Sequence, residues 1–193
     1  MRIISGQWRG RKLVAPKGDA TRPTADRMRE TLFSMLTSRL GDFDGLQVAD
    51  LFAGSGALGL EALSRGAANC LFVEQDRAAI DAIRTNITAL GAQTSARVES
   101  SSATQLRAAS QPLDLILVDP PYRSGTGAVA LDRLLRLGWI GPQTWISLET
   151  AFNEDVVIKG LACESERRVG KGKLSLFRLV ETPTDPVPIG DPD

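Results

Sequence analysis

The chain has 193 residues, of which 42% are hydrophobic, and its 23 basic and 23 acidic side chains give a formal net charge of zero. This length corresponds to about one domain, which can bury roughly 70% of the surface of the unfolded chain. Because histidine is absent and Cys70 and Cys163 lie far apart, we expect neither a zinc site, nor a disulfide framework, nor a serine–histidine triad. Without a long apolar run or a signal peptide, the sequence predicts a soluble, cytoplasmic protein without a membrane span, and nothing in it requires more than a monomer.

The beginning of the chain is basic although the total charge is zero. Residues 1–40 contain nine basic and three acidic side chains, so the remainder carries the compensating negative charge. One interpretation is an ordinary solvated surface. The other is a binding surface for a polyanion, in which glycines and Trp8 between the basic residues allow a nucleic-acid backbone or base to approach.

The first 40 residues predict a small β arm followed by a helix. Short β-like runs at 2–5 and 12–15 alternate with turn residues, which indicates a hairpin without a core of its own. Residues 24–40 have helical spacing, with Thr24 as the expected N-cap after Pro23. The apolar stripe of this helix should face the core and consists of Met28, Leu32, Met35, Leu36 and Leu40.

Strands and helices then alternate regularly, which is typical of a doubly wound, Rossmann-like α/β fold. The expected sheet has seven strands, is mostly parallel and ends in an antiparallel hairpin across the turn KGK. Strands are expected at 46–52, 69–75, 96–100, 113–119, 144–150, 161–170 and 174–181, and helices at 57–66, 77–90, 103–109 and 127–137. The chain thus divides into a basic arm (1–23), a main domain (24–181) and an acidic, proline-rich tail (182–193) that we expect to be disordered.

A glycine-rich loop follows the first strand of the main domain. Gly54, Gly56 and Gly59 are spaced as G-x-G-x-x-G, and Glu74 follows Gly54 by 20 positions, which is the fingerprint of a dinucleotide-binding turn. S-adenosylmethionine is the alternative ligand, because it carries no phosphate and presents a sulfonium and an α-amino group. Asp50, an acid just before the glycines, favours S-adenosylmethionine over a dinucleotide.

The predicted cofactor site draws on the ends of several strands. Glu74 is suited to accept hydrogen bonds from the hydroxyls of a ribose, which both ligands contain. The residues that follow the strand at 96–100 are expected to contact the edge of the adenine ring. Gly59 is interpreted as a packing residue that lets its helix approach the sheet. The predicted cofactor-binding residues are Asp50, Phe52, Ala53, Gly54, Ser55, Gly56, Glu74, Gln75, Ser102, Ala103 and Asp119.

The tetrapeptide DPPY at 119–122 indicates the reaction. The Asp119 carboxylate and the Pro120 carbonyl can each accept one N–H of an exocyclic amine, which orients its nitrogen toward a methyl donor. Pro121 with Pro120 stiffens the turn, and Tyr122 offers a ring on which an extruded base can stack. A strong base is not required, since the methylated amine is acidic and loses its proton readily. The other reading is a proline-stiffened turn.

A cysteine nucleophile, as cytosine-C5 methylation requires, is not expected. Both Cys70 and Cys163 are interpreted as small hydrophobic residues.

Four segments together resemble the bacterial RsmD family of 16S rRNA guanine-N2 methyltransferases. They are 1-MRIISGQWRGRKL-13, 21-TRPTADRMRETLF-33, 50-DLFAGSGALGLEALSRGA-67 and 119-DPPY-122. The resemblance implies S-adenosylmethionine as cofactor, 16S rRNA in the 30S subunit or its assembly intermediate as substrate, and ribosomal proteins as part of what is recognised. Many family members have phenylalanine at the position of Tyr122. The residues that the resemblance and the charge pattern assign to RNA are Arg2, Trp8, Arg9, Arg11, Lys12, Arg22 and Thr24.

Two other functions remain open at this point. DPPY fits a DNA adenine-N6 methyltransferase at least as well, although 193 residues leave little room for a DNA-recognition domain. A non-catalytic RNA-binding or assembly factor with an inherited cofactor fold is the second alternative, and the intact DPPY argues against it.

Overall fold

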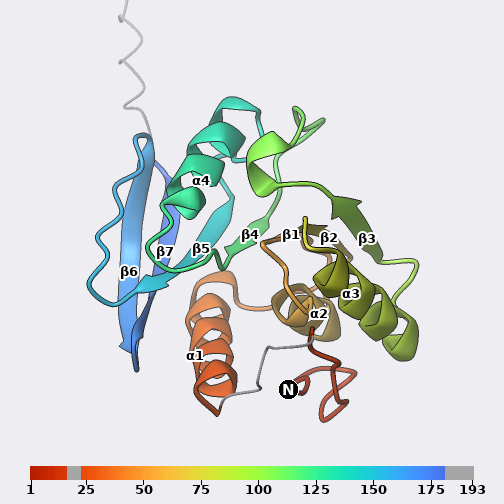
Figure 1. Ribbon diagram of the computed structural model, residues 1–193. Helices are drawn as coiled ribbons and strands as arrows, with labels where there is room; N and C mark the ends of the chain where they lie inside the picture. The colour runs from red at the N-terminus through yellow and green to blue at the C-terminus, as the bar shows by residue number, and fades with distance from the viewer. Residues whose placement is uncertain (17–22, 181–193) are drawn as a thin grey trace, which may run out of the picture.

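The computed structural model describes residues 1–16 and 23–180, which form a three-layer α/β/α arrangement (Figure 1). The acidic tail lies outside the described residues. The elements are α1 (Pro23–Leu40), β1 (Gln47–Leu51), α2 (Ala57–Ser64), β2 (Asn69–Glu74), α3 (Arg77–Leu90), β3 (Ala96–Ser100), the 3₁₀ turn η1 (Ala103–Gln105), β4 (Leu115–Val118), α4 (Thr126–Arg136), β5 (Trp145–Ala151), β6 (Leu161–Val169) and β7 (Gly172–Leu179).

All seven strands form one sheet in the order β3-β2-β1-β4-β5-β7-β6. Strands β1 to β5 are parallel to one another, whereas β7 is antiparallel to both β5 and β6. This confirms the predicted seven-stranded sheet with its antiparallel C-terminal hairpin. The strand order reverses between β1 and β4, so the carboxyl ends of these two strands border the crevice where ligands bind in open α/β sheets.

The two faces of the sheet carry separate hydrophobic clusters, because successive side chains of a strand point to opposite faces. On β1, Val48 belongs to the cluster that includes residues of α1, α2 and α3, whereas Ala49 belongs to the cluster that includes residues of α4. Strand β4 is therefore apolar on both faces, and β1 is buried on both faces although it carries Asp50.

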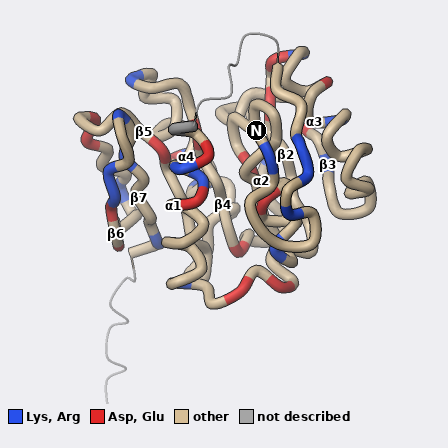
Figure 2. The backbone as a smooth tube through the Cα atoms, turned by 90° about the horizontal axis from the view of Figure 1, so that it is seen from below, with Lys and Arg blue, Asp and Glu red and all other residues tan. Residues whose placement is uncertain are grey.

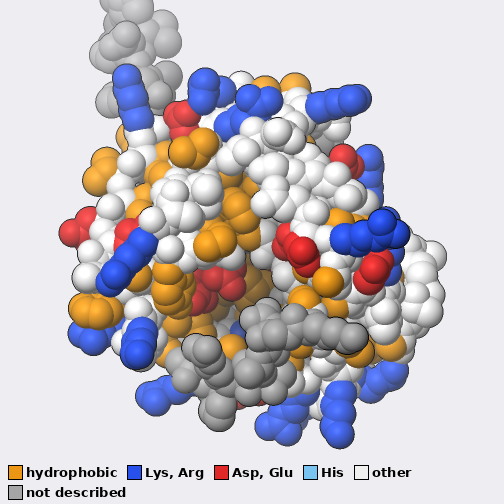
Figure 3. All heavy atoms as spheres, viewed as in Figure 1, with side chains coloured by type: hydrophobic (Ala, Val, Ile, Leu, Met, Phe, Trp, Pro, Cys, Tyr) orange, Lys and Arg blue, Asp and Glu red, His pale blue; other side chains and the backbone are white. Residues whose placement is uncertain are grey.

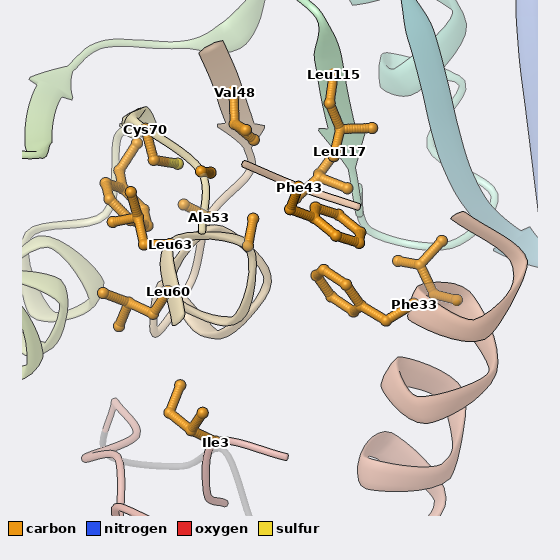
Figure 4. Packing of buried hydrophobic residues seen from close by; sticks show 14 of the residues in the cluster. Ile3, Phe33, Phe43, Val48, Ala53, Leu60, Leu63, Cys70, Leu115 and Leu117 are labelled. Carbon is orange, nitrogen blue, oxygen red and sulfur yellow. The ribbon is translucent and has the colours of Figure 1, made fainter. Parts of the chain in front are cut away.

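The N-terminal arm and α1 pack on the same side as α2 (Figure 4). Ile3 of the arm points toward Leu60 of α2, and only 1% of Ile3 is exposed. Phe33 of α1 lies beside Phe43, with ring centroids 5.5 Å apart. The arm thus contributes to the main core and does not form a unit apart from it.

Three predicted boundaries were wrong. Helix α1 begins at Pro23, so Thr24 lies in its first turn and is not the N-cap. Residues 103–109 form only the 3₁₀ turn η1, because bonds to distant residues hold the following chain extended: the Arg107 carbonyl accepts Trp139 Nε1–H and the Ala109 N–H donates to Leu137. The KGK turn is displaced, since β7 already starts at Gly172.

Two further expectations also need correction. The predicted hairpin of the arm is reduced to a single antiparallel bridge between Arg2 and Lys12. Cys70 is buried as predicted, but Cys163 is exposed, because it lies on β6, an edge strand of the sheet. No helix within residues 1–16 and 23–180 is both long and apolar enough to cross a membrane.

Gly59 has the packing role that the sequence predicted. A β-carbon on Gly59 would lie 2.4 Å from Cε1 of Phe72 and 2.5 Å from Sγ of Cys70, both on β2. These distances are far below van der Waals contact, so only glycine lets α2 lie this close to the sheet.

Replacing Gly59 by alanine should destabilise the protein by about 1–3 kcal/mol, the range for overpacking a filled core. At a helix position without a steric conflict, glycine to alanine raises the free energy of unfolding by up to about 1 kcal/mol. A decrease in that free energy, measured by urea unfolding, therefore reports the steric conflict. Combining Gly59→Ala with Cys70→Ala should recover part of the loss, because one clashing atom is removed. A single variant as stable as the wild type would contradict this account.

Candidate active site

The glycine-rich loop connects the end of β1 to the start of α2. Phe52, Gly54 and Gly56 all have positive φ angles, of 60°, 55° and 78°. Glycine adopts these angles readily, whereas Phe52 does so at a cost of about 1–3 kcal/mol, a kind of strain that concentrates at functional sites. The Ala53 N–H donates to the Val73 carbonyl of β2 at 3.2 Å, which ties the loop to the neighbouring strand.

Asp50 is buried beneath this loop. Its Oδ2 accepts the Gly59 N–H at 2.8 Å, one of the N–H groups left without an intrahelical partner in the first turn of α2. The N-cap residue of α2, Gly56, has no side chain to do this. Burial, followed by the nearby Glu74 carboxylate, raises the pKa of Asp50 to about 8. Asp50 thus joins β1 to α2 below the loop, and the predicted contact with a cofactor stays a prediction.

Glu74 holds the loop from the other side. Its Oε2 accepts the Gly54 N–H at 2.9 Å, and its Oε1 accepts the N–H groups of Gln75 and Asp76 at 2.7 and 2.9 Å. A carboxylate offers about four acceptor positions. Three are used by these bonds, so one acceptor position remains, on Oε2. A ribose hydroxyl can bond there without displacing a backbone N–H group.

The other predicted cofactor residues lie around the same strand ends. Ser102 caps η1 by accepting the Thr104 N–H at 3.3 Å, and Ala103 is buried. The Ser55 hydroxyl points toward the Met1 sulfur at 3.4 Å, so it does not face the outer side of the loop. A side chain at Gly54, in contrast, would meet no atom closer than the Phe52 carbonyl oxygen at 4.0 Å.

The DPPY segment begins directly after β4 and lies beside the glycine-rich loop. Leu51 pairs with Val118 in the sheet, and the Asp119 N–H donates to the Leu51 carbonyl at 3.4 Å. The Pro120 ring is buried against α4, where a β-carbon on Gly127 would lie 2.9 Å from Pro120 Cγ. The two predicted motifs, 65 positions apart from Gly54 to Asp119, are thereby brought to adjacent strand ends.

Tyr122 is 45% exposed and leans toward β5 and β7. Its hydroxyl donates to Oε1 of Glu149 at 2.5 Å. A β-carbon on Gly172 would lie 2.7 Å from that hydroxyl and 2.4 Å from Met28 Cε, so the ring edge packs against bare backbone and α1. Burial and the bond to Glu149 raise the pKa of Tyr122, which keeps the phenol protonated.

Two acids that the sequence patterns did not indicate hold this segment in place. Glu149 of β5 binds Tyr122, and Oε2 of Glu154 accepts the Arg123 N–H at 3.0 Å. Arg123 has a φ of 59°, the second non-glycine residue with positive φ in the described chain after Phe52. Both strained residues therefore follow the strands that meet at the switch point.

Figure 3 shows a hollow at the centre of the face where β4 ends above α1, with acidic side chains inside it. A cavity of about 820 Å³ lies elsewhere, between β3 and the segment that was predicted to be helical, and Arg97, Arg107 and Trp139 are among the residues that border it. The central hollow is the candidate active site, because the DPPY segment begins at the end of β4 beside the glycine-rich loop.

The N-terminal arm is fastened to α2 through a buried carboxylate. Glu61, with a fully buried side chain, accepts the N–H groups of Ile4 and Ser5 at 2.7 and 3.0 Å and pairs with Arg65. A β-carbon on Gly6 would lie 1.8 Å from the Ser64 carbonyl oxygen. The backbone of the arm therefore lies directly on the helix.

Bonds to α1 and α3 complete this attachment. Arg29, almost fully buried, donates to the Arg2 carbonyl at 2.5 Å, and its burial lowers its pKa. Asn86 of α3 bonds to both the N–H and the C=O of Val14 and also donates to the Ser55 carbonyl. One amide side chain thus connects the end of the arm to the glycine-rich loop.

The fixed arm displays its basic residues outward. Arg2, Arg9, Arg11 and Lys12 are exposed, and Figure 2 marks basic positions along the chain near the N-terminus. Trp8 is half-buried against the core, so it serves at least partly as an anchor. Of the other residues assigned to RNA, Arg22 lies outside the described residues and Thr24 lies in the first turn of α1.

This strand order and site define the class of S-adenosylmethionine-dependent methyltransferases. Magnesium protoporphyrin IX methyltransferase from Synechocystis, solved with bound S-adenosylmethionine, shares the fold at a TM-score of 0.62 and 14% identity, covering 83% of this chain and 86% of that one. The Escherichia coli protein yhhF matches at a TM-score of 0.79 and 37% identity, covering 93% and 97% of the two chains.

Sequence similarity also identifies the family. Residues 1–178 match the family model described as Conserved hypothetical protein 95. "Ribosomal RNA small subunit methyltransferase D" of Escherichia coli is 43% identical over 150 residues, 78% of this chain and 74% of the relative. The protein of the same name in Haemophilus influenzae is 35% identical over 81% and 82% of the two chains. The chain therefore belongs to this family, and its cofactor is S-adenosylmethionine and not a dinucleotide.

The buried carboxyl of Asp50 should make stability depend on pH. Its pKa is about 8 in the folded chain against about 3.8 in the unfolded chain, so between these values the folded state binds more protons and stability falls as pH rises. Asp50→Asn can still accept the Gly59 N–H but does not ionise. Between pH 5 and pH 8, urea unfolding of the variant should show a slope of stability against pH that is smaller by up to about 1.4 kcal/mol per pH unit. If the wild type and Asp50→Asn had equal slopes, the raised pKa of Asp50 would be contradicted.

Weakening the attachment at Glu61 should loosen the arm. Glu61→Gln turns one acceptor oxygen into an N–H donor that faces a backbone N–H, at a cost of about 1–3 kcal/mol. Amide hydrogen exchange at Ile4 and Ser5 should accelerate at least about tenfold, while exchange in β4 is unchanged. Arg9→Ala is the control on the exposed side of the arm, and a similar acceleration in that variant would argue against a specific role for Glu61.

Proposed function

We propose that the protein transfers a methyl group from S-adenosylmethionine to the exocyclic N2 amine of a guanine in 16S rRNA, in the small subunit or its precursor. The observation that carries this proposal is the meeting of the glycine-rich loop and DPPY at the ends of β1 and β4, bridged by the bond from Asp119 N–H to the Leu51 carbonyl. Family membership supplies the substrate class, since the relatives are named small-subunit rRNA methyltransferases.

The cofactor would lie along three strand ends. Gly54 leaves open space above the loop for the methionine end. Glu74 has one acceptor position left for a ribose hydroxyl. The segment at Ser102 and Ala103, after β3, is where we expect the adenine. When bound, S-adenosylmethionine supplies a methyl group on a cationic sulfur that keeps the electron pair of the broken C–S bond.

Residues after β4 position the acceptor amine. The Asp119 carboxylate and the Pro120 carbonyl accept its two N–H groups, so the nitrogen lone pair is turned toward the methyl group. Tyr122, held at its hydroxyl by Glu149, presents its ring for stacking of the extruded base. The proton released from the methylated nitrogen leaves to solvent on the exposed side of Asp119.

The arm provides the contact with the RNA backbone. Its exposed Arg2, Arg9, Arg11 and Lys12 can neutralise phosphates without reading sequence, and the buried attachment to α2 keeps them at a set distance from the active site. We propose that the protein acts on this substrate as a cytoplasmic monomer, and that ribosomal proteins form part of the recognised surface.

The decisive experiment uses small subunits from cells that lack the protein. The purified protein is incubated with these subunits and with S-adenosylmethionine labelled in the methyl group, and the RNA is then digested to nucleosides. Label should appear in N2-methylguanosine. Label in N6-methyladenosine, or transfer to DNA, would overturn the proposal in favour of the adenine alternative.

The variant Asp119→Ala separates an enzyme from a non-catalytic assembly factor. Loss of the orienting carboxylate should lower methyl transfer at least about a hundredfold, while binding to the subunit is retained. Arg136→Ala is the control, since Arg136 is exposed on α4 and its side chain bonds only to Asp132 within the described chain. If Asp119→Ala transferred methyl groups as fast as the control, Asp119 would have no part in the reaction.

A further inference from the structure

Glu149 is a half-buried carboxylate beside the DPPY segment. It lies on β5, the parallel neighbour of β4, and its Oε1 accepts the Tyr122 hydroxyl. Its Oε2 makes no hydrogen bond, and no lysine or arginine pairs with it, within residues 1–16 and 23–180. A half-buried carboxylate normally has such partners, and a bound substrate could supply one.

One carboxylate, Glu149, bonds to the Tyr122 hydroxyl, and a second, Asp119, precedes Tyr122 by three positions. Both Glu149 and Asp119 act on it electrostatically, after the larger effect of burial. Gly172, on the far side, has no side chain and borders both the hydroxyl and Glu149 Oε1. A base stacked at Tyr122 would thus present its edge toward two acidic side chains, one after β4 and one on β5.

The edges of the two candidate bases differ at the ring nitrogen. In guanine, N1–H lies next to the N2 amine, so two adjacent positions are donors. In adenine, N1 is an acceptor next to the N6 amine. Asp119 can accept from the amine of either base, but a second carboxylate is matched only by guanine and would repel the N1 lone pair of adenine. Sites built to bond a substrate N–H strongly reject an analogue that lacks it.

We propose that Glu149 selects guanine by accepting its N1–H on Oε2. This inference rests on the proposed function and adds to it the residue that distinguishes guanine from adenine in a pocket whose DPPY segment fits both. It also separates two roles of Glu149: Oε1 positions the Tyr122 ring, and Oε2 reads the base.

The test first locates the methylated nucleotide by digesting the labelled RNA to oligonucleotides and sequencing them. Small subunits are then reconstituted with 16S RNA that carries either guanine or 2,6-diaminopurine at that position. 2,6-Diaminopurine keeps the N2 amine but has an acceptor at N1. The wild type should methylate guanine at least about tenfold faster. Glu149→Gln keeps an acceptor for Tyr122 and places an N–H donor toward N1, so the ratio of guanine to diaminopurine rates should fall at least tenfold.

Tyr122→Phe is the matched control, because it removes the hydroxyl and leaves the Glu149 carboxylate. Its ratio should equal that of the wild type even if both rates change. A purely structural role of Glu149 would slow both substrates equally in Glu149→Gln, and that result would overturn the inference, as would equal rates for both bases with the wild type. If the wild type methylated neither base, the proposed function itself would fail.

Discussion

The close contact between α2 and the sheet is the constraint on which both the glycine-rich loop and the N-terminal arm depend. Gly59 allows this contact and Asp50 bonds to the first turn of the helix from below, so the end of β1 and the start of α2 are held together. The glycine-rich loop has to span the short remaining distance, which accounts for its positive φ angles. The other side of the same helix carries Glu61, to which the N-terminal arm is bonded.

A second, independent set of bonds holds the DPPY segment and Arg123 in place. Residues 119–123 leave β4 and are held from β5 and the loop that follows it, through Glu149 at Tyr122 and Glu154 at Arg123. The helix α4 closes over Pro120, where Gly127 permits the contact. The glycine-rich loop and the DPPY segment thus have separate supports that meet only along β1 and β4, so changes at one support need not disturb the other.

Much of this could be predicted from the sequence because the relevant signals are local. Strand and helix periodicity gave the sheet, and the spacing around Gly54 and the tetrapeptide at Asp119 located the two motifs. The roles of Glu61 and Glu149 could not be predicted, because their partners lie 57 and 27 positions away and no local pattern marks them. The segment 103–109 resembled a helix, yet tertiary bonds from Trp139 and Leu137 hold it extended.

The attachment of the arm has a consequence for how a target nucleotide is chosen. Gly6 rests on the Ser64 carbonyl of α2, and Asn86 ties Val14 and Ser55 to the same helix α3. Under the proposed function, the arm and the methyl-transfer centre are then held at a fixed distance from each other. Only an RNA fold whose phosphates and extruded base have the matching separation fits between them, so the protein measures shape rather than sequence.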